Sequence, residues 1–221
     1  MKGMYRMGTR MPMRTVDEAK GAYCWLMTDD DTIRPGAVAA LLAALNGRPS
    51  LVVLNAEDWT VGLRQQLKSH RVPVRQDRRY EPGDDEALFV DLGFHLSFIG
   101  ATVIDRELWL ARSRSPYFGS AFVHFGVIFQ APLPRGALFL AEPALRGRIG
   151  NISYGPRRFD IWMFRWPRLV WSFTQFSRAS RERVALEAPW AHPQALFTAR
   201  GNGVYDLGVF ARRILPRRLA P

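Results

Sequence analysis

The sequence predicts an α/β fold in which a mixed, mostly parallel sheet is flanked by helices. Two short apolar runs, Tyr23–Met27 and Leu51–Leu54, have the continuous hydrophobicity of strands that are covered on both faces. Between them, Ala37–Leu45 is rich in alanine and leucine and follows Pro35-Gly36, a common way for a helix to begin. Thr15–Lys20 has the character of the last turns of a helix that leads directly into the first run, which is the second half of a βαβ unit.

The remaining elements are predicted from the same kinds of pattern. The strand that starts at Leu51 is expected to close at three polar residues, Asn55, Glu57 and Asp58. The charged stretch 59–93 is expected to be a variable insertion that contains one helix. The expected elements after Leu54 are a helix over Val61–Ser69, a strand over Leu96–Ile104, a helix over Asp105–Ala111, an apolar helix over Ser120–Gln130 and a last short strand over Leu138–Glu142.

Composition indicates a globular protein with a strong positive charge. The chain has 221 residues, 48% of them hydrophobic, and a formal net charge of +11. This charge predicts attraction to phosphate-rich partners, which include nucleotides, nucleic acids and anionic membrane surfaces, and it does not choose among them. The single cysteine, Cys24, excludes an intramolecular disulfide. Because no apolar stretch is long enough to span a bilayer and no signal peptide is recognisable, a cytoplasmic location is the expectation.

The first apolar run ends at three consecutive carboxylates, Asp29, Asp30 and Asp31. The carboxyl ends of strands are where α/β sheets bind ligands, and side chains two apart on an extended backbone point the same way. Asp29 and Asp31 could therefore share one cation. A solvated acidic turn that caps the next helix is an equally open interpretation, because aspartate is a preferred capping residue.

The last third of the chain is aromatic and basic. Phe159–Phe176 contains three tryptophans and four phenylalanines, and further arginines follow at Arg212, Arg213, Arg217 and Arg218. One interpretation is an interfacial segment whose aromatic and arginine side chains rest on a membrane surface. The other is that these aromatic side chains belong to a hydrophobic core.

The order of the motifs resembles a known enzyme family. An apolar strand that ends in Asp29-Asp30-Asp31, followed by Pro35-Gly36 and a helix, is similar to the metal-binding segment of family 2 glycosyltransferases, which have the Rossmann-like GT-A fold. Later segments resemble the branch of that family that includes abequosyltransferase-like enzymes of bacterial surface polysaccharide synthesis. These segments are Leu96–Gly100, Asp105–Trp109, Tyr117–Ser120 with His124, Arg148–Tyr154 and Ala199–Tyr205.

The resemblance implies an inverting, metal-dependent transfer of a sugar from a nucleotide diphosphate donor to a hydroxyl on a saccharide or lipid-linked saccharide. It implies Mg²⁺ or Mn²⁺ as the cofactor, with Asp29 and Asp31 as metal ligands. The donor-binding residues that it implies are Asp29, Asp30, Arg148 and Asn151. Separately, the interfacial interpretation of the aromatic and basic C-terminal residues would place the chain peripherally on the inner face of the cytoplasmic membrane.

The general base that the resemblance implies lies in the helix over Ser120–Gln130. The family often places an acidic residue there, whereas this chain offers His124. An imidazole can act as a base near neutral pH. A packed or metal-contacting histidine is the alternative for this position.

The beginning of the chain departs from the family pattern. Family members start with a strand, a turn and a helix that hold the nucleotide base, followed by another strand that ends in Asp. That region is not found here, and only Met7–Lys20 could match the helix just before the strand that ends in the acidic triplet. The expectation is therefore an N-terminally truncated or degenerate relative that lacks the first βαβ portion. Its expected organisation is an irregular segment over residues 1–14, a partial GT-A catalytic domain over 15–157 and a helical, membrane-facing extension over 158–221.

Two other functions remain open at this stage. One is a catalytically incomplete fragment or a basic, noncatalytic module that binds a partner or nucleic acid, although no zinc-finger, RNP or helix-turn-helix spacing is present. The other is a phosphoryl-transfer enzyme that uses the same carboxylates for two cations. The chain lacks the glycine-rich phosphate loop that many such enzymes carry.

Overall fold

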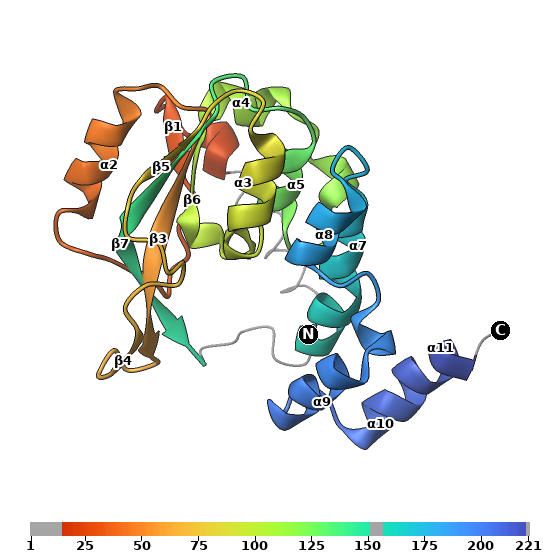
Figure 1. Ribbon diagram of the computed structural model, residues 1–221. Coiled ribbons are helices and arrows are strands. Elements are labelled where there is room, and N and C mark those ends of the chain that lie inside the picture. The colour runs from red at the N-terminus through yellow and green to blue at the C-terminus, as the bar shows by residue number, and fades with distance from the viewer. Residues whose placement is uncertain (1–14, 151–156, 220–221) are drawn as a thin grey trace. The chain divides into compact units, whose positions relative to one another are not determined.

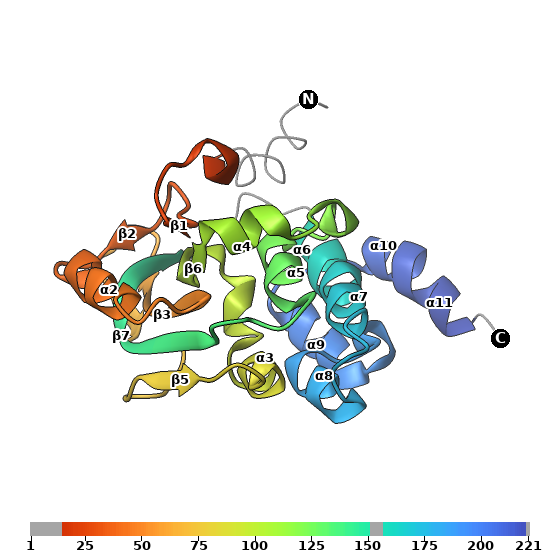
Figure 2. The ribbon, with the colours of Figure 1, turned by 90° about the horizontal axis from the view of Figure 1, so that it is seen from above.

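The computed structural model describes residues 15–150 and 157–219, with side chains described as far as Arg217. The chain divides into two compact units, Met1–Ile152 and Ser153–Pro221, which are called the sheet unit and the C-terminal unit below. Each unit is considered separately. The described part of the sheet unit contains one mixed sheet with helices on both of its faces (Figure 1, Figure 2).

The sheet unit follows this order along the chain. After a helical turn at residues 15–18, its elements are β1 (Tyr23–Trp25), β2 (Thr32–Ile33), α2 (Ala37–Leu45), β3 (Leu51–Thr60), β4 (Gln66–Lys68), β5 (Arg78–Tyr80), α3 (Asp85–Leu92), the 3-10 turns η1 (His95–Ser97) and η2 (Ile99–Ala101), β6 (Thr102–Asp105), α4 (Arg106–Ala111), the 3-10 turn η3 (Ser115–Tyr117), α5 (Val123–Phe129) and β7 (Ala137–Ile149).

The described sheet has the strand order β1-β6-β3-β7-β2, with β4 paired to β3 and β5 paired to β7. Among the described strands, only β3 and β7 pair in parallel, and the other pairings are antiparallel. The prediction of a mostly parallel sheet is therefore wrong. A continuous apolar run indicates that both faces of a strand are covered, but it does not indicate the direction of the neighbouring strand. Here the antiparallel β6 lies between β1 and β3.

Strand direction nevertheless brings three strand ends together. Because β6 runs antiparallel to both β1 and β3, these two strands run the same way, and β7 runs parallel to β3. The carboxyl ends of β1, β3 and β7 therefore lie at one edge of the sheet. Residues that follow or end these strands are brought close to one another at that edge.

The core of the sheet unit lies on both faces of β3. Leu51, Val52, Val53 and Leu54 have no exposed surface. On one face, α2 packs through Ala37 and Leu41, and α3, α4 and α5 cover the other (Figure 1). The large buried side chains of those three helices include Phe89, Trp109 and Phe125. The helix over Ala37–Leu45 and the helix that Asp105 begins are confirmed, the latter with Asp105 Oδ1 accepting a hydrogen bond of 2.8 Å from the amide of Leu108.

Several predicted boundaries are corrected by hydrogen bonding that the sequence pattern does not reveal. β3 continues through Asn55, Glu57 and Asp58 because each polar side chain finds partners inside the protein. The helix expected over Val61–Ser69 is absent, and this stretch instead forms a hairpin in which β4 pairs with β3. The strand expected over Leu96–Ile104 is confined to β6, because 3-10 turns occupy most of the preceding residues. The last strand is much longer than expected, running from Ala137 to Ile149.

The C-terminal unit is helical in its described residues. Its elements are α6 (Arg158–Asp160), the π-helical turn η5 (Ile161–Arg165), α7 (Trp166–Trp171), α8 (Arg178–Val184), the 3-10 turn η6 (Pro189–Ala191), α9 (Pro193–Gly201), α10 (Leu207–Val209), the π-helical turn η7 (Phe210–Ile214) and α11 (Leu215–Leu219). No helix among the described residues is both long enough and apolar enough to cross a membrane. A cluster of Phe159, Met163, Leu196, Ala199 and Ile214 forms one hydrophobic centre of this unit.

Candidate active site

The three carboxylates lie between β1 and β2, at the shared edge where β1, β3 and β7 end. β1 ends at Trp25, and Asp29 and Asp30 occupy a bend rather than an extended strand. The backbone here is therefore not the extended strand on which the expectation that Asp29 and Asp31 point the same way was based. The indole Nε1 of Trp25 donates a hydrogen bond of 2.8 Å to the carbonyl of Gly100, which fastens β1 to the turn beside the site.

The side chain of Asp31 is held by a neighbouring hydroxyl group. Its Oδ2 accepts a hydrogen bond of 2.6 Å from the hydroxyl of Thr28. A Cβ atom at Gly100 would lie 3.3 Å from Asp31 Oδ2 and 2.7 Å from the ring of Phe98, so a glycine is needed for both groups to approach this backbone.

The surroundings of Asp31 raise the pKa of its carboxyl group. Partial burial is the main cause that raises the pKa of Asp31, and the charge of Asp30 acts in the same direction. The Thr28 hydrogen bond, the charge of Arg71 and a backbone hydrogen bond from Arg148 oppose this shift without cancelling it. A carboxylate whose charge is incompletely compensated gains the most from a nearby positive group.

Arg148 holds the bend that carries the carboxylates. Its Nε donates a hydrogen bond of 2.8 Å to the backbone carbonyl of Asp30, and its Nη1 donates one of 2.7 Å to the carbonyl of Val61. The structure thus brings the end of β7 to the bend. These bonds fix the backbone of the acidic bend against the β3–β4 turn.

Arg71 is a site residue that sequence reasoning missed. Its guanidinium forms an ion pair with Asp58 of β3 and lies 4.0 Å from the centroid of the Phe98 ring. A Cβ atom at Gly147 would lie 2.4 Å from Arg71 Nη2, so β7 needs a glycine there to admit the side chain. The only sequence signal was the basic character of an insertion that follows β3 at this edge.

Asn55 fixes the backbone beside Arg71. Its amide nitrogen donates hydrogen bonds of 2.9 Å to the carbonyl of Val72 and 3.0 Å to the carbonyl of Ala141, and its Oδ1 accepts one of 3.0 Å from the amide of Val72. The side chain is fully buried. A buried amide whose donors and acceptor are satisfied is a rigid link, so the loop that carries Arg71 is held to both β3 and β7.

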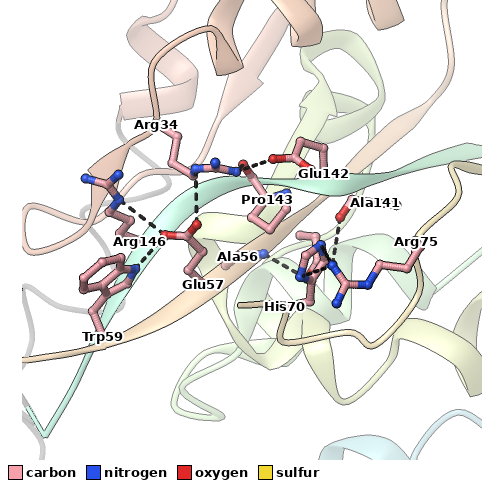
Figure 3. Close-up of polar contacts among 11 residues, drawn as sticks. Arg34, Ala56, Glu57, Trp59, His70, Arg75, Ala141, Glu142, Pro143 and Arg146 are labelled. Atoms are coloured by element: carbon pink, nitrogen blue, oxygen red, sulfur yellow. Dashed lines mark hydrogen bonds and ion pairs between the residues drawn. The ribbon is translucent and has the colours of Figure 1, made fainter. Parts of the chain in front are cut away.

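Glu57 forms a second charged cluster beside the first. Its carboxylate faces Arg34 and Arg146, each with an N–O distance of 3.3 Å, and accepts a hydrogen bond of 2.6 Å from Trp59 Nε1 (Figure 3). Glu57 and Asp58 are consecutive on β3, so their side chains point to opposite sides of the strand. Arg34 follows β2, and the cluster therefore anchors the strand that comes directly after Asp31.

His124 lies inside α5 and is 4% exposed. Its Nε2 lies 2.8 Å from the carbonyl oxygen of Leu96. Because a carbonyl only accepts, Nε2 carries the proton of the neutral ring. Burial lowers the pKa of His124 to about 4, and the Leu96 hydrogen bond opposes that shift only partly. A buried imidazole that protonates so weakly is a poor proton acceptor at neutral pH, so the geometry favours the packed-histidine alternative.

The other sequence-derived candidates are only partly described. Asn151 lies outside the described residues.

Within residues 15–150 and 157–217, no group of three or more histidine, cysteine, aspartate or glutamate side chains is arranged to hold a metal ion. Mg²⁺ is commonly bound by one or two carboxylates together with substrate phosphates and water, so a site of that kind does not require a group of three protein ligands.

Comparison with known proteins adds an independent observation. The chain is similar to abequosyltransferase RfbV of Salmonella typhimurium, with 21% identity over 208 residues. The match covers 86% of this chain and 62% of the Salmonella protein, so the chain spans less than two thirds of that protein's length. No family model matches the chain. The similarity is distant, and it is to a glycosyltransferase, the class of enzyme that the order of the motifs resembles.

Proposed function

We propose that this chain is a glycosyltransferase of the family 2, GT-A type, and that Asp29–Asp31, Arg71 and Arg148 form the part of its donor site that receives the diphosphate. The observation that carries the proposal is that carboxylates and arginines meet where β1, β3 and β7 end, in a chain similar to a glycosyltransferase. The sugar would come from a nucleotide diphosphate donor and would pass to a hydroxyl of a saccharide or lipid-linked saccharide in bacterial surface polysaccharide synthesis.

Sugar transfer leaves a nucleoside diphosphate with additional negative charge, and the protein must stabilise that charge. Arg71 is suited to this task because its guanidinium is held in place by Asp58 and Phe98 before any ligand binds. Fixed charges need no reorganisation when charge develops on the leaving group. Arg148 contributes by holding the acidic bend in position through the Asp30 carbonyl.

Asp31, assisted by Asp29, would hold a Mg²⁺ or Mn²⁺ ion. Hard carboxylate oxygens are the ligands that these ions prefer, and partial burial leaves the charge of Asp31 incompletely compensated. When bound, the cation would supply Lewis-acid neutralisation of the diphosphate. Asp30 would contact the donor. Transfer with inversion needs a group that removes the acceptor proton, and the burial of His124 argues against placing that role on its imidazole.

Calorimetric titration with a panel of nucleoside diphosphates, each with and without Mn²⁺, tests the proposal. We expect one nucleotide to bind in a Mn²⁺-dependent way, and Asp31→Asn to weaken that binding by at least about tenfold, the scale of a lost charge-assisted contact. Arg71→Met should weaken nucleotide binding even without metal. Asp17→Asn is the matched control, because it removes a carboxylate that is half-exposed and pairs with Arg114 instead.

Three results separate the parts of the proposal. If no nucleoside diphosphate binds the wild-type chain, the donor site is wrong. If Asp31→Asn binds the nucleotide and Mn²⁺ as the wild type does, the ligand assignment is wrong. If the chain consumes a donor sugar and NMR shows that the product keeps the anomeric configuration of the donor, inversion is wrong.

A further inference from the structure

The positive charge of the chain is concentrated in the C-terminal unit. Residues 153–221 contain twelve arginines, no lysine and four acidic residues, and so carry +8 of the formal net charge of +11. A unit of this size with such an excess of arginine creates a positive potential that attracts anionic surfaces. The partner of this unit is therefore expected to be rich in negative charge.

The aromatic segment does not provide an exposed apolar surface on this unit. Within Phe159–Phe176, the side chains of Phe159, Trp166, Phe173 and Phe176 are at most 6% exposed. Phe159 and Met163 belong to the hydrophobic cluster that also contains Ile214. The core interpretation of this segment is confirmed for these residues, and a surface that contacts apolar material must be sought elsewhere.

The last helical segment carries such a surface. α10, η7 and α11 follow one another without interruption over residues 207–219. Leu207 is 72% exposed, Leu215 is 41% exposed, and Ala211 between them is exposed as well. These residues, which we call the apolar stripe, are spaced by four, and the wide π-helical turn at Phe210–Ile214 brings residues four apart closer to one line. Ile214, by contrast, is fully buried.

An exposed aromatic side chain lies on α9 of the same unit. Phe197 is 75% exposed, whereas its neighbours Leu196 and Ala199 are buried in the cluster that also contains Ile214. Both helices thus pack onto one hydrophobic centre with their inner faces and still present large apolar side chains to solvent. The exposed side chains Phe197, Leu207 and Leu215 are not used by this hydrophobic centre, so they are available to a partner.

Arginines border the apolar stripe. Arg213 and Arg217 lie 5.3 Å and 4.6 Å from the centroid of the Phe164 ring, and Arg213 also donates a hydrogen bond of 2.6 Å to Asp160. Arg212 is exposed on the same helical segment. A helix with an apolar face and neighbouring cationic side chains has the composition of segments that lie in the plane of a membrane interface.

We propose that residues 207–217, together with Phe197, form a surface that binds anionic phospholipid bilayers. In this arrangement Leu207, Leu215 and Phe197 enter the boundary between headgroups and acyl chains, and the arginines contact lipid phosphates. Nucleic acid would satisfy the same positive charge, but Leu207 and Leu215 offer no face on which a base can stack, and Phe197 is the one aromatic side chain named in this surface. The stripe therefore favours lipid. This surface is separate from the proposed donor site and does not depend on it.

Co-sedimentation with vesicles tests the proposal on the full chain. We expect binding to vesicles of equal parts phosphatidylglycerol and phosphatidylcholine, and much weaker binding to phosphatidylcholine alone. Leu207→Asp combined with Leu215→Asp should lower partitioning by more than about tenfold, since each change removes the burial of a leucine. Arg212→Ala should lower partitioning about fivefold. The matched control is Val38→Asp combined with Leu42→Asp, which changes two exposed aliphatic residues of α2 in the sheet unit.

Each other outcome overturns the lipid proposal. The assignment of the membrane-binding surface is wrong if the Leu207→Asp, Leu215→Asp variant partitions like the wild type. It is also wrong if the Val38→Asp, Leu42→Asp variant loses as much binding. The proposal that the partner is lipid is wrong if the chain does not bind the anionic vesicles. Binding of a single-stranded RNA oligonucleotide that is salt-sensitive and unaffected by the stripe variant, without vesicle binding, would assign the arginines to nucleic acid instead. Circular dichroism of each variant confirms that it remains folded.

Discussion

Arg112 is the side chain whose loss should affect the stability of the sheet unit most clearly. It lies directly after α4, is 9% exposed, and its guanidinium donates four hydrogen bonds of 2.6 to 2.9 Å to backbone carbonyls. Two of these carbonyls, those of Val127 and Ile128, belong to the last turn of α5. Carbonyls in the last turn of a helix have no backbone N–H donor within the helix, so they need a donor from elsewhere. Arg112 therefore ties the end of α4 to the end of α5.

The cost of removing this guanidinium follows from the burial of its acceptors. The bonds to Val127 and Ile128 are buried, so water cannot replace the lost donors, whereas those to Ala131 and Pro132 are only partly buried. A hydrogen bond from a charged donor contributes about 1.5 to 3 kcal/mol, and the two buried bonds dominate the sum. Arg112→Met, which keeps the length of the side chain, should therefore lower the free energy of unfolding by about 3 to 5 kcal/mol.

Urea unfolding of the full chain measures this cost from the shift of the midpoint at a constant slope. Arg112→Lys should fall between the wild type and Arg112→Met, because an ammonium has three donors without the planar fork. Arg106→Met is the control: its guanidinium reaches two carbonyls at 3.3 Å, in partly exposed or exposed surroundings, and its loss should cost less than about 1 kcal/mol. An Arg112→Met variant within about 1 kcal/mol of the wild type would show that the carbonyls find other partners and would refute the reasoning.

Three further predictions concern groups near the candidate site. Glu57→Gln removes two ion pairs but keeps an acceptor for Trp59. Because the partner arginines are 27% and 40% exposed, urea unfolding should show that the free energy of unfolding falls by only about 1 to 2 kcal/mol. A variant as stable as the wild type would contradict this prediction. Burial lowers the pKa values of His95 and His124 to about 4 in the folded chain. As the pH falls, these histidines therefore become protonated in the unfolded chain before they do in the folded chain. The free energy of unfolding should consequently fall as pH drops from about 6.5 towards 4. A flat profile would contradict it. Burial raises the pKa of Asp31, so its ionised form disfavours folding at neutral pH; Asp31→Asn should raise the melting temperature at pH 7, and the gain should shrink as pH falls. A less stable variant at pH 7 would contradict it.

Elements with strong local signals could be predicted from the sequence. α2 follows Pro35-Gly36 and is formed by nine alanine, leucine and valine residues, so its limits are set by residues within the segment itself. α4 likewise begins at an aspartate whose side chain caps it. In both cases the information that decides the structure is local, and local information is what a sequence pattern contains.

The length and pairing of the strands depend on distant residues and could not be predicted. Asn55, Glu57 and Asp58 ended the predicted strand because polar residues usually do, yet each is held by a residue between 13 and 89 positions away. β7 runs through Pro143 because the register with β3 shifts between Leu54 and Ala56. The antiparallel insertion of β6 between β1 and β3 is a long-range choice that hydrophobic patterns do not record.

The candidate site shows the same division. The acidic triplet and Arg148 could be found from motif order, and the structure brings them together through the Asp30 carbonyl. Arg71 could not, because its importance comes from Asp58 and Phe98, which lie 13 and 27 residues away from it in the sequence. Burial also changes how a residue must be interpreted: His124 matches the motif, but a neutral, enclosed imidazole bonded to a backbone carbonyl is better explained by packing.

The central claim is that the acidic bend binds a divalent cation together with a nucleoside diphosphate. Electron paramagnetic resonance of free Mn²⁺ tests it most directly, because bound Mn²⁺ loses the signal of the free ion. With the nucleotide that the calorimetric panel selects, the wild-type chain should remove free Mn²⁺ at lower concentration than the nucleotide alone does, whereas Asp31→Asn should not. Equal removal of free Mn²⁺ by the wild type, by Asp31→Asn and by nucleotide alone would contradict the account.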